Sequence, residues 1–204
     1  DADWRESTYK NYFWMVPYDL AGLIEIIGGK EVAEKRLDEF FVRLDAGYND
    51  TWFASGNEPS FHIPWVYNWI GRPDKCTKTI RRTLNEQYSS LINGLPGNDD
   101  LGTMGAWYVF ACTGLYPMIP GVGGFTLNTP IFDRITIHRA KGDISILGGS
   151  ETKLYTTALN VNGVAHNSSW IDWNQLENGA TLEYKTSAKA TGKWGQRDLP
   201  PSFK

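Results

Sequence analysis

The stretch GLPGNDDLGTMGAWYVFACTGLYPMIP, residues 94–120, contains the point at which the character of the chain changes. Its first part is a polar loop in which Gly, Pro, Asn and Asp are concentrated, a composition typical of turns. An almost wholly apolar segment follows over residues 103–115, and Gly114 with Pro117 ends it as such residues end helices. After Pro120 the helical period disappears, so this stretch divides a helical part from a β-rich part.

The two parts differ in the spacing of their apolar residues. Upstream, apolar residues recur at helical spacing in four segments, residues 17–27, 31–44, 62–70 and 75–88. Downstream, alternating or β-branched runs predict strands at residues 125–127, 131–138, 143–147, 154–159, 170–173 and 181–184. Asn162-Gly163 is a hairpin signal between two of them. We therefore expect an α+β fold in two parts, residues 1–118 helical and residues 119–204 β-rich.

Composition excludes several classes of partner. The 204 residues carry a formal net charge of −3, without the basic excess that nucleic-acid binding requires. The sequence has no apolar run long enough for a transmembrane helix. We therefore expect no nucleic-acid partner and no membrane partner.

Aromatic residues are abundant, with nine Trp, ten Tyr and nine Phe. Such residues fill a large core in most proteins. They can also line a cleft, where a flat aromatic face suits the C–H surface of a sugar ring. Composition alone leaves both interpretations open.

Several local signals concern processing and compartment. Cys76 and Cys112 could form one bridge at most, and we expect two inert buried thiols. Asn49-Asp50-Thr51 and Asn167-Ser168-Ser169 are N-glycosylation acceptor triplets, which are compatible with secretion. The chain opens at Asp1 without an initiator Met or a leader segment. We therefore expect a fragment or a processed chain.

Two polar loops carry the side chains best suited to chemistry. The first is Gly56–Ser60 and the second is residues 94–100. Together they supply five amide or carboxylate groups suited to a hard cation such as Ca²⁺: Asn57, Glu58, Asn98, Asp99 and Asp100. The spacing does not match an EF-hand, so such a site would be assembled from distant loops. The alternative is that these residues simply cap the helices that follow them.

Paired carboxylates are also what hydrolysis of a glycosidic bond requires. One carboxyl group protonates the leaving oxygen, and the other activates water or attacks the sugar. The candidates are Glu6, Asp19, Glu58, Asp99 and Asp100. Residue types alone do not select a pair. The three histidines, His62, His138 and His166, are too scattered to suggest a metal triad.

Four segments together resemble a known family. They are residues 6–19, 56–62, 94–102 and 106–117, which we call the four motif segments. Their order and spacing resemble the C-terminal part of glycoside hydrolase family 92, the Ca²⁺-dependent exo-acting α-mannosidases. The resemblance implies the last part of an (α/α)6 barrel followed by a β-rich C-terminal sub-domain. It also implies a missing N-terminal portion of the same enzyme, because family members have further helices and a β-sandwich domain.

The resemblance also implies an activity and residue roles. The activity is Ca²⁺-dependent release of terminal α-linked mannose with inversion, from mannose-containing oligosaccharides such as N-glycans, by a secreted or periplasmic enzyme. Glu6 stands at the general-acid position, Asp100 at the general-base position, and Asp99 is the second candidate base. Substrate contacts are implied for Asn57, Glu58, His62 and Asn98. Ca²⁺ ligands are implied for Asn57, Glu58 and Asp100.

For inversion, the two carboxyl groups should lie about 6.5–9.5 Å apart, whereas about 5 Å would indicate retention. Three other hypotheses remain open. The chain could be a non-catalytic carbohydrate-binding module, a catalytically dead relative, or a structural scaffold whose loops are caps.

Overall fold

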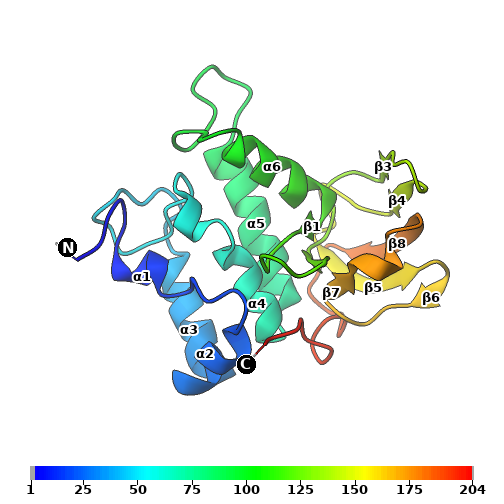
Figure 1. The fold of residues 1–204 in the computed structure, drawn as a ribbon, viewed down its shortest axis with the longest axis horizontal. Helices are drawn as coiled ribbons and strands as arrows, with labels where there is room; N and C mark the ends of the chain where they lie inside the picture. The colour runs from blue at the N-terminus through cyan, green and yellow to red at the C-terminus, as the bar shows by residue number, and fades with distance from the viewer. Residues whose placement is uncertain (1–2, 204) are drawn as a thin grey trace.

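The computed structural model describes residues 3–203 and shows helices on one side of the molecule and strands on the other (Figure 1). This arrangement confirms the α+β class. The α-helices are α1 (Tyr9–Tyr12), α2 (Leu20–Ile26), α3 (Lys30–Phe40), α4 (Val66–Trp69), α5 (Pro73–Gln87) and α6 (Thr103–Thr113). Two 3₁₀ turns, η1 (Glu58–Ser60) and η2 (Ile63–Trp65), precede α4, and a third, η3 (Trp173–Gln175), lies among the strands.

Local signals explain three of the helix ends. The Asp19 side chain accepts a hydrogen bond from Gly22 N at 3.0 Å, so this candidate carboxylate is the N-cap of α2. Pro73 occupies the first turn of α5, where a missing N–H costs nothing. Gly114 is the C-cap of α6, as predicted.

The expected helix over residues 62–70 is only partly right. The structure has η2 and then the four-residue α4 in its place. Pro64 lies at the start of η2 and cannot donate a backbone hydrogen bond, which favours tight turns over one continuous helix.

Two separate groups of buried apolar side chains form the interior. The larger lies among the helices and includes Trp65, Trp69 and Trp107. The smaller lies among the strands and includes Ile146, Leu159 and Leu182. Six of the nine tryptophans are buried, so the core interpretation holds for most of the tryptophans.

The strands form two sheets. The strands are β1 (Leu115–Tyr116), β2 (Gly124–Leu127), β3 (Arg134–Ile137), β4 (Ile144–Leu147), β5 (Tyr155–Val161), β6 (Val164–Ala165), β7 (Trp170–Asp172) and β8 (Ala180–Ser187). The small sheet has the order β1-β2-β7 and the large one β3-β4-β8-β5-β6. Asn162 and Gly163, with φ of 51° and 79°, form the predicted turn between β5 and β6. The β4–β8 pair is parallel, and the other pairs are antiparallel.

The C-terminal tail returns to the helices, where Figure 1 shows the C-terminus near α2 and α4. Trp69 Nε1 donates to Pro201 O at 3.1 Å, and Ala21 N donates to Ser202 Oγ at 3.0 Å. Phe203 N donates to Tyr18 O at 2.7 Å. The last residues of the β-rich part therefore bind the first helices directly.

Both cysteines are buried free thiols, as expected. Burial raises the pKa of each thiol, which keeps both protonated and unreactive near neutral pH. No helix within residues 3–203 has the length and apolar character needed to cross a membrane.

Candidate active site

Glu6 lies at the end of the N-terminal loop, in the first motif segment. Its backbone is left-handed, with φ of 57°, and its side chain is exposed. The side chain of Asn57 donates from Nδ2 to the carbonyl oxygen of Glu6 at 2.6 Å. Asn57 is 6% exposed, so this bond is well shielded from water. The second motif segment therefore fixes the backbone that carries the Glu6 carboxylate.

Asn11 joins the first motif segment to the loop before the second. Its Nδ2 donates to Trp52 O at 3.1 Å, and its Oδ1 accepts from Ala54 N at 3.2 Å and from Ser60 Oγ at 2.6 Å. Asn11 and Ser60 are both fully buried. Sequence reasoning missed both residues, although a polar residue among aromatics is a signal that a buried hydrogen bond is needed.

The second and third motif segments meet through two glycines. A Cβ atom on Gly56 would lie 2.5 Å from Pro96 O, and one on Gly97 would lie 2.3 Å from Gly56 O. Only residues without a side chain allow the two backbones to approach this closely. The loop that carries Asn98–Asp100 is therefore pressed against the loop that carries Asn57 and Glu58.

The two aspartates of the third segment have different structural roles. Asp99 Oδ1 accepts hydrogen bonds from Met104 N and Gly105 N, both at 3.0 Å, and so caps the start of α6. Asp100 has a left-handed backbone with φ of 31° and an exposed side chain. The capping interpretation is therefore correct for Asp99, while Asp100 faces solvent. Asn98 is exposed beside them.

The His62 ring binds the first motif segment. Its Nε2 lies 2.8 Å from Trp14 O, which requires the nitrogen to be protonated and to donate. Burial lowers the pKa of His62, and the bond to Trp14 O opposes this effect only in part. The neutral ring therefore positions the chain here, and its substrate contact stays a prediction.

Glu58 provides the clearest candidate for a metal-binding oxygen. Its Oε1 is enclosed and lacks a hydrogen-bond partner among the described residues. Such an oxygen fits the ligand preference of Ca²⁺. However, the part of the chain from residue 3 to 203 contains no group of three or more His, Cys, Asp or Glu side chains able to hold a metal ion. One oxygen therefore fits the ion, and among the described residues no cluster of carboxylates stands beside it.

Aromatic side chains of the fourth motif segment support the second. Trp107 Nε1 donates to Phe61 O at 2.9 Å, and its ring stacks on Tyr88 with centroids 5.6 Å apart. Trp65 stacks on Tyr116 with centroids 3.8 Å apart. All four motif segments are thus joined in one cluster by hydrogen bonds and glycine contacts.

Comparison with known proteins gives this cluster a family. The model of the glycosyl hydrolase family 92 catalytic domain matches residues 1–188. An uncharacterized secreted glycosidase of Arthroderma benhamiae is 32% identical over 97% of this chain. The structure of a family GH92 α-mannosidase from Bacteroides thetaiotaomicron matches 97% of the chain with 33% identity and a TM-score of 0.88.

A family GH92 inverting mannosidase from the same bacterium matches with 26% identity and a TM-score of 0.87. The chain spans 26% of the fungal relative and 27% and 30% of the two bacterial structures. The family model matches most of the chain, and the relatives are similar to it in sequence and in fold. This chain therefore belongs to glycosyl hydrolase family 92.

Proposed function

We propose that the protein containing this chain is an exo-α-mannosidase that releases terminal α-linked mannose with inversion. The observation that carries the proposal is the assembly of Glu6, Asn57 and Asp100 on segments in direct contact. Asn57 binds the Glu6 backbone, and Gly56 meets Gly97 just before the Asp100 loop. Two of the solved relatives are described as mannosidases of this family, which supports the choice of sugar.

The reaction requires two proton transfers on opposite faces of the sugar. Glu6 donates its proton to the leaving glycosidic oxygen as the bond from that oxygen to the anomeric carbon breaks. Asp100 takes a proton from the water that attacks the anomeric carbon from the other side. Asp99 is less suited to this role because its Oδ1 already caps α6. Asn57 is a positioning residue, since it holds Glu6 through the backbone.

Ca²⁺ belongs to the proposal as a cofactor of the whole protein. The shielded Glu58 oxygen would be one ligand, and the amide oxygen of Asn57 is a second candidate. Asp100, the third residue implied as a ligand, is exposed and better suited to contact water. Ca²⁺ takes about six to eight oxygen ligands, so the remaining ligands would come from water, substrate and the rest of the protein.

Exposed apolar residues support a companion segment. Ile92 and Leu101 are fully exposed, and Leu91 and Val109 are 70% and 58% exposed. Leu91 and Ile92 are neighbours in the chain, and adjoining exposed apolar residues commonly mark an interaction surface. We propose that the remainder of the enzyme, including the other helices of an (α/α)6 barrel, covers them. The domain boundary after residue 118 stays a prediction.

The proposed location is outside the cytoplasm, secreted or periplasmic. The fungal relative is described as secreted, which supports this choice. The acceptor residues Asn49 and Asn167 are both exposed.

The test is hydrolysis of a panel of α-mannobioses by a longer protein that contains residues 1–204, with the anomer of the released mannose followed by NMR. We expect Glu6→Gln and Asp100→Asn to lower kcat by at least about a hundredfold, the usual contribution of a general acid or base. Glu183→Gln and Asp133→Asn, at exposed positions in the β-rich part, are the matched controls.

A chelator should abolish release, and added Ca²⁺ should restore it. Release of the retained anomer would refute the inverting mechanism. No release with intact sugar binding would favour a catalytically dead relative or a binding module.

A further inference from the structure

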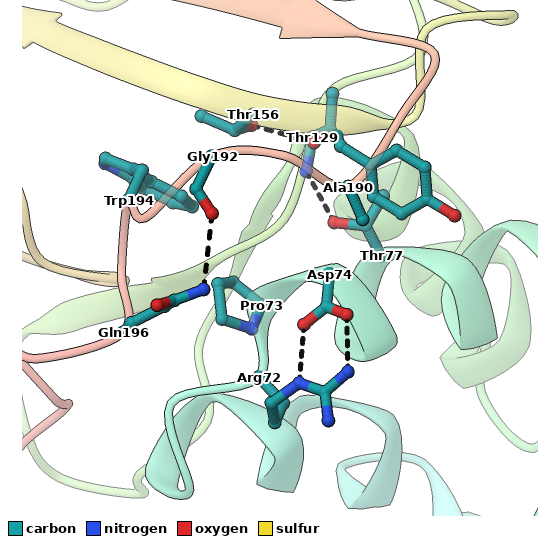
Figure 2. Close-up of a pocket in the computed structure, with 11 residues that line it drawn as sticks. Arg72, Pro73, Asp74, Thr77, Thr129, Thr156, Ala190, Gly192, Trp194 and Gln196 are labelled. Carbon is teal, nitrogen blue, oxygen red and sulfur yellow. Dashed lines mark hydrogen bonds and ion pairs between the residues drawn. The ribbon is translucent and has the colours of Figure 1, made fainter.

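A cavity of about 240 Å³ lies between the helical and β-rich parts, away from the four motif segments. Its walls come from the start of α5, from β5 and from the tail segment 190–196, as Figure 2 shows. None of its lining residues belongs to the candidate active site. The cavity is therefore a separate candidate site, which we call the seam cavity.

One wall of the seam cavity is a fixed aromatic ring. Trp194 Nε1 donates to His166 O at 2.8 Å, and the residue is 6% exposed. This bond holds the indole in one orientation beside the cavity (Figure 2). Tyr155 adds a second aromatic side chain to the lining. Aromatic rings provide apolar area at low entropic cost and suit the C–H face of a pyranose.

The ion pair between Arg72 and Asp74 lines another side of the cavity. Arg72 donates to Asp74 through Nε at 2.9 Å and through Nη2 at 2.7 Å, and it also pairs with Glu34. Burial opposes ionisation of Asp74, but the bonds from Arg72 hold the pKa of its carboxyl below the usual range. The charges of the pair are thus compensated, and the Asp74 carboxylate also interacts with the backbone N–H groups of Asp74 and Lys75, so its oxygens are largely satisfied within the protein.

The remaining polar groups favour a neutral ligand with hydroxyl groups. Gln196 donates through Nε2 to Gly192 O at 3.2 Å, which leaves its amide oxygen as an acceptor. Thr156 contributes a hydroxyl that shares a 2.8 Å hydrogen bond with Thr129. An anion is disfavoured because the Asp74 carboxylate already occupies the first turn of α5. Pockets for drug-sized ligands measure about 300–1,000 Å³, so this smaller cavity suits one sugar ring.

We propose that the seam cavity binds a single pyranose unit of a neutral glycan, with the edge of Trp194 beside the ring and with Gln196 and Thr156 bonding its hydroxyls. Such a site would hold a glycan chain on the protein without taking part in bond cleavage. The proposal does not require the hydrolytic activity proposed above, because it rests on different residues.

The experiment is a titration of ¹⁵N-labelled chain with methyl α-D-mannopyranoside, followed through the Gly192 amide and the Trp194 indole N–H. The blocking variant is Ala190→Phe, since Ala190 is exposed and lines the cavity. Ala188→Phe is the matched control, because Ala188 is also exposed, lies two positions earlier and is not among the lining residues. Gln196→Ala is a second variant that removes an acceptor without adding bulk.

We expect saturable shifts of both reporters in the unmodified chain and in Ala188→Phe. Ala190→Phe and Gln196→Ala should each weaken binding about tenfold or more, as loss of a central contact does. The absence of saturable shifts, or equal affinity in all variants, would overturn the proposal. Asp100→Asn separates the two sites: if it abolishes the shifts, the sugar binds only at the candidate active site and the seam proposal is wrong. Seam binding without hydrolysis by the longer protein would instead refute the proposed function alone.

Discussion

Replacing Asn11 by alanine tests how the motif segments are held together. The substitution removes three hydrogen bonds, of which two are buried and one is partly buried, and leaves Ala54 N and the Ser60 hydroxyl without their acceptor. An unsatisfied buried polar group costs about 1–3 kcal/mol, and two donors and one carbonyl are affected. The Ser60 hydroxyl can rotate to another acceptor, which reduces its share. We therefore expect Asn11→Ala to lower the free energy of unfolding by about 3 kcal/mol or more.

The assay is urea unfolding of the chain, followed by tryptophan fluorescence and far-UV circular dichroism. Ser60→Ala removes only one of the three bonds and should cost about 1 kcal/mol. Asn93→Ala is the control at an exposed asparagine and should change stability by no more than about 0.5 kcal/mol. A loss of less than about 1 kcal/mol in Asn11→Ala would show that this side chain does not hold the segments together.

Three more predictions concern the same cluster. Asp99→Ala should lower the free energy of unfolding by about 1 kcal/mol through loss of the α6 cap, whereas Asp100→Ala should leave it almost unchanged; thermal unfolding distinguishes them. Gly97→Ala places a methyl group against Gly56 O and should destabilise the chain by about 1–3 kcal/mol in urea, and an unchanged midpoint would contradict the close contact. Burial lowers the pKa of His62 in the folded chain. The neutral ring therefore contributes to the free energy of unfolding above the pKa of a histidine in the unfolded chain, about 6.5, and this contribution is lost as pH falls below that value. Unfolding measured from pH 7.5 to 5 should therefore show a stability loss that His62→Gln reduces.

The sequence predicted the division into helices and strands because that division depends on local periodicity. The apolar run of α6 and its glycine end, the proline at the start of α5 and the Asn162-Gly163 turn are all signals within a few residues. Signals within a few residues could not predict the parallel pairing of β4 with β8. It joins strands separated by β5, β6 and β7, and only tertiary packing selects that neighbour.

The sequence singles out the residues of the candidate site, whose catalytic and binding roles stay predictions, but it does not reveal their contacts. Sequence reasoning left open whether Asp99 or Asp100 is the helix cap, because either spacing suits the start of α6. The two hydrogen bonds to Asp99 Oδ1 decide this point. The hydrogen bond from Asn57 to the Glu6 carbonyl oxygen joins two residues 51 positions apart in the chain. It forms only because two loops approach each other, and no local sequence pattern encodes that approach.

The return of the C-terminal tail to the first helices has a consequence for the order of folding. Ala21 and Ser202 are joined across 181 positions, and Trp69 reaches Pro201 across 132. Contacts between such distant positions slow folding, because a long loop must close before they form. During synthesis, α2 can complete its packing only after Ser202 has emerged from the ribosome. The helical part, although synthesised before the β-rich part, therefore reaches its full set of native contacts only after that part has been made.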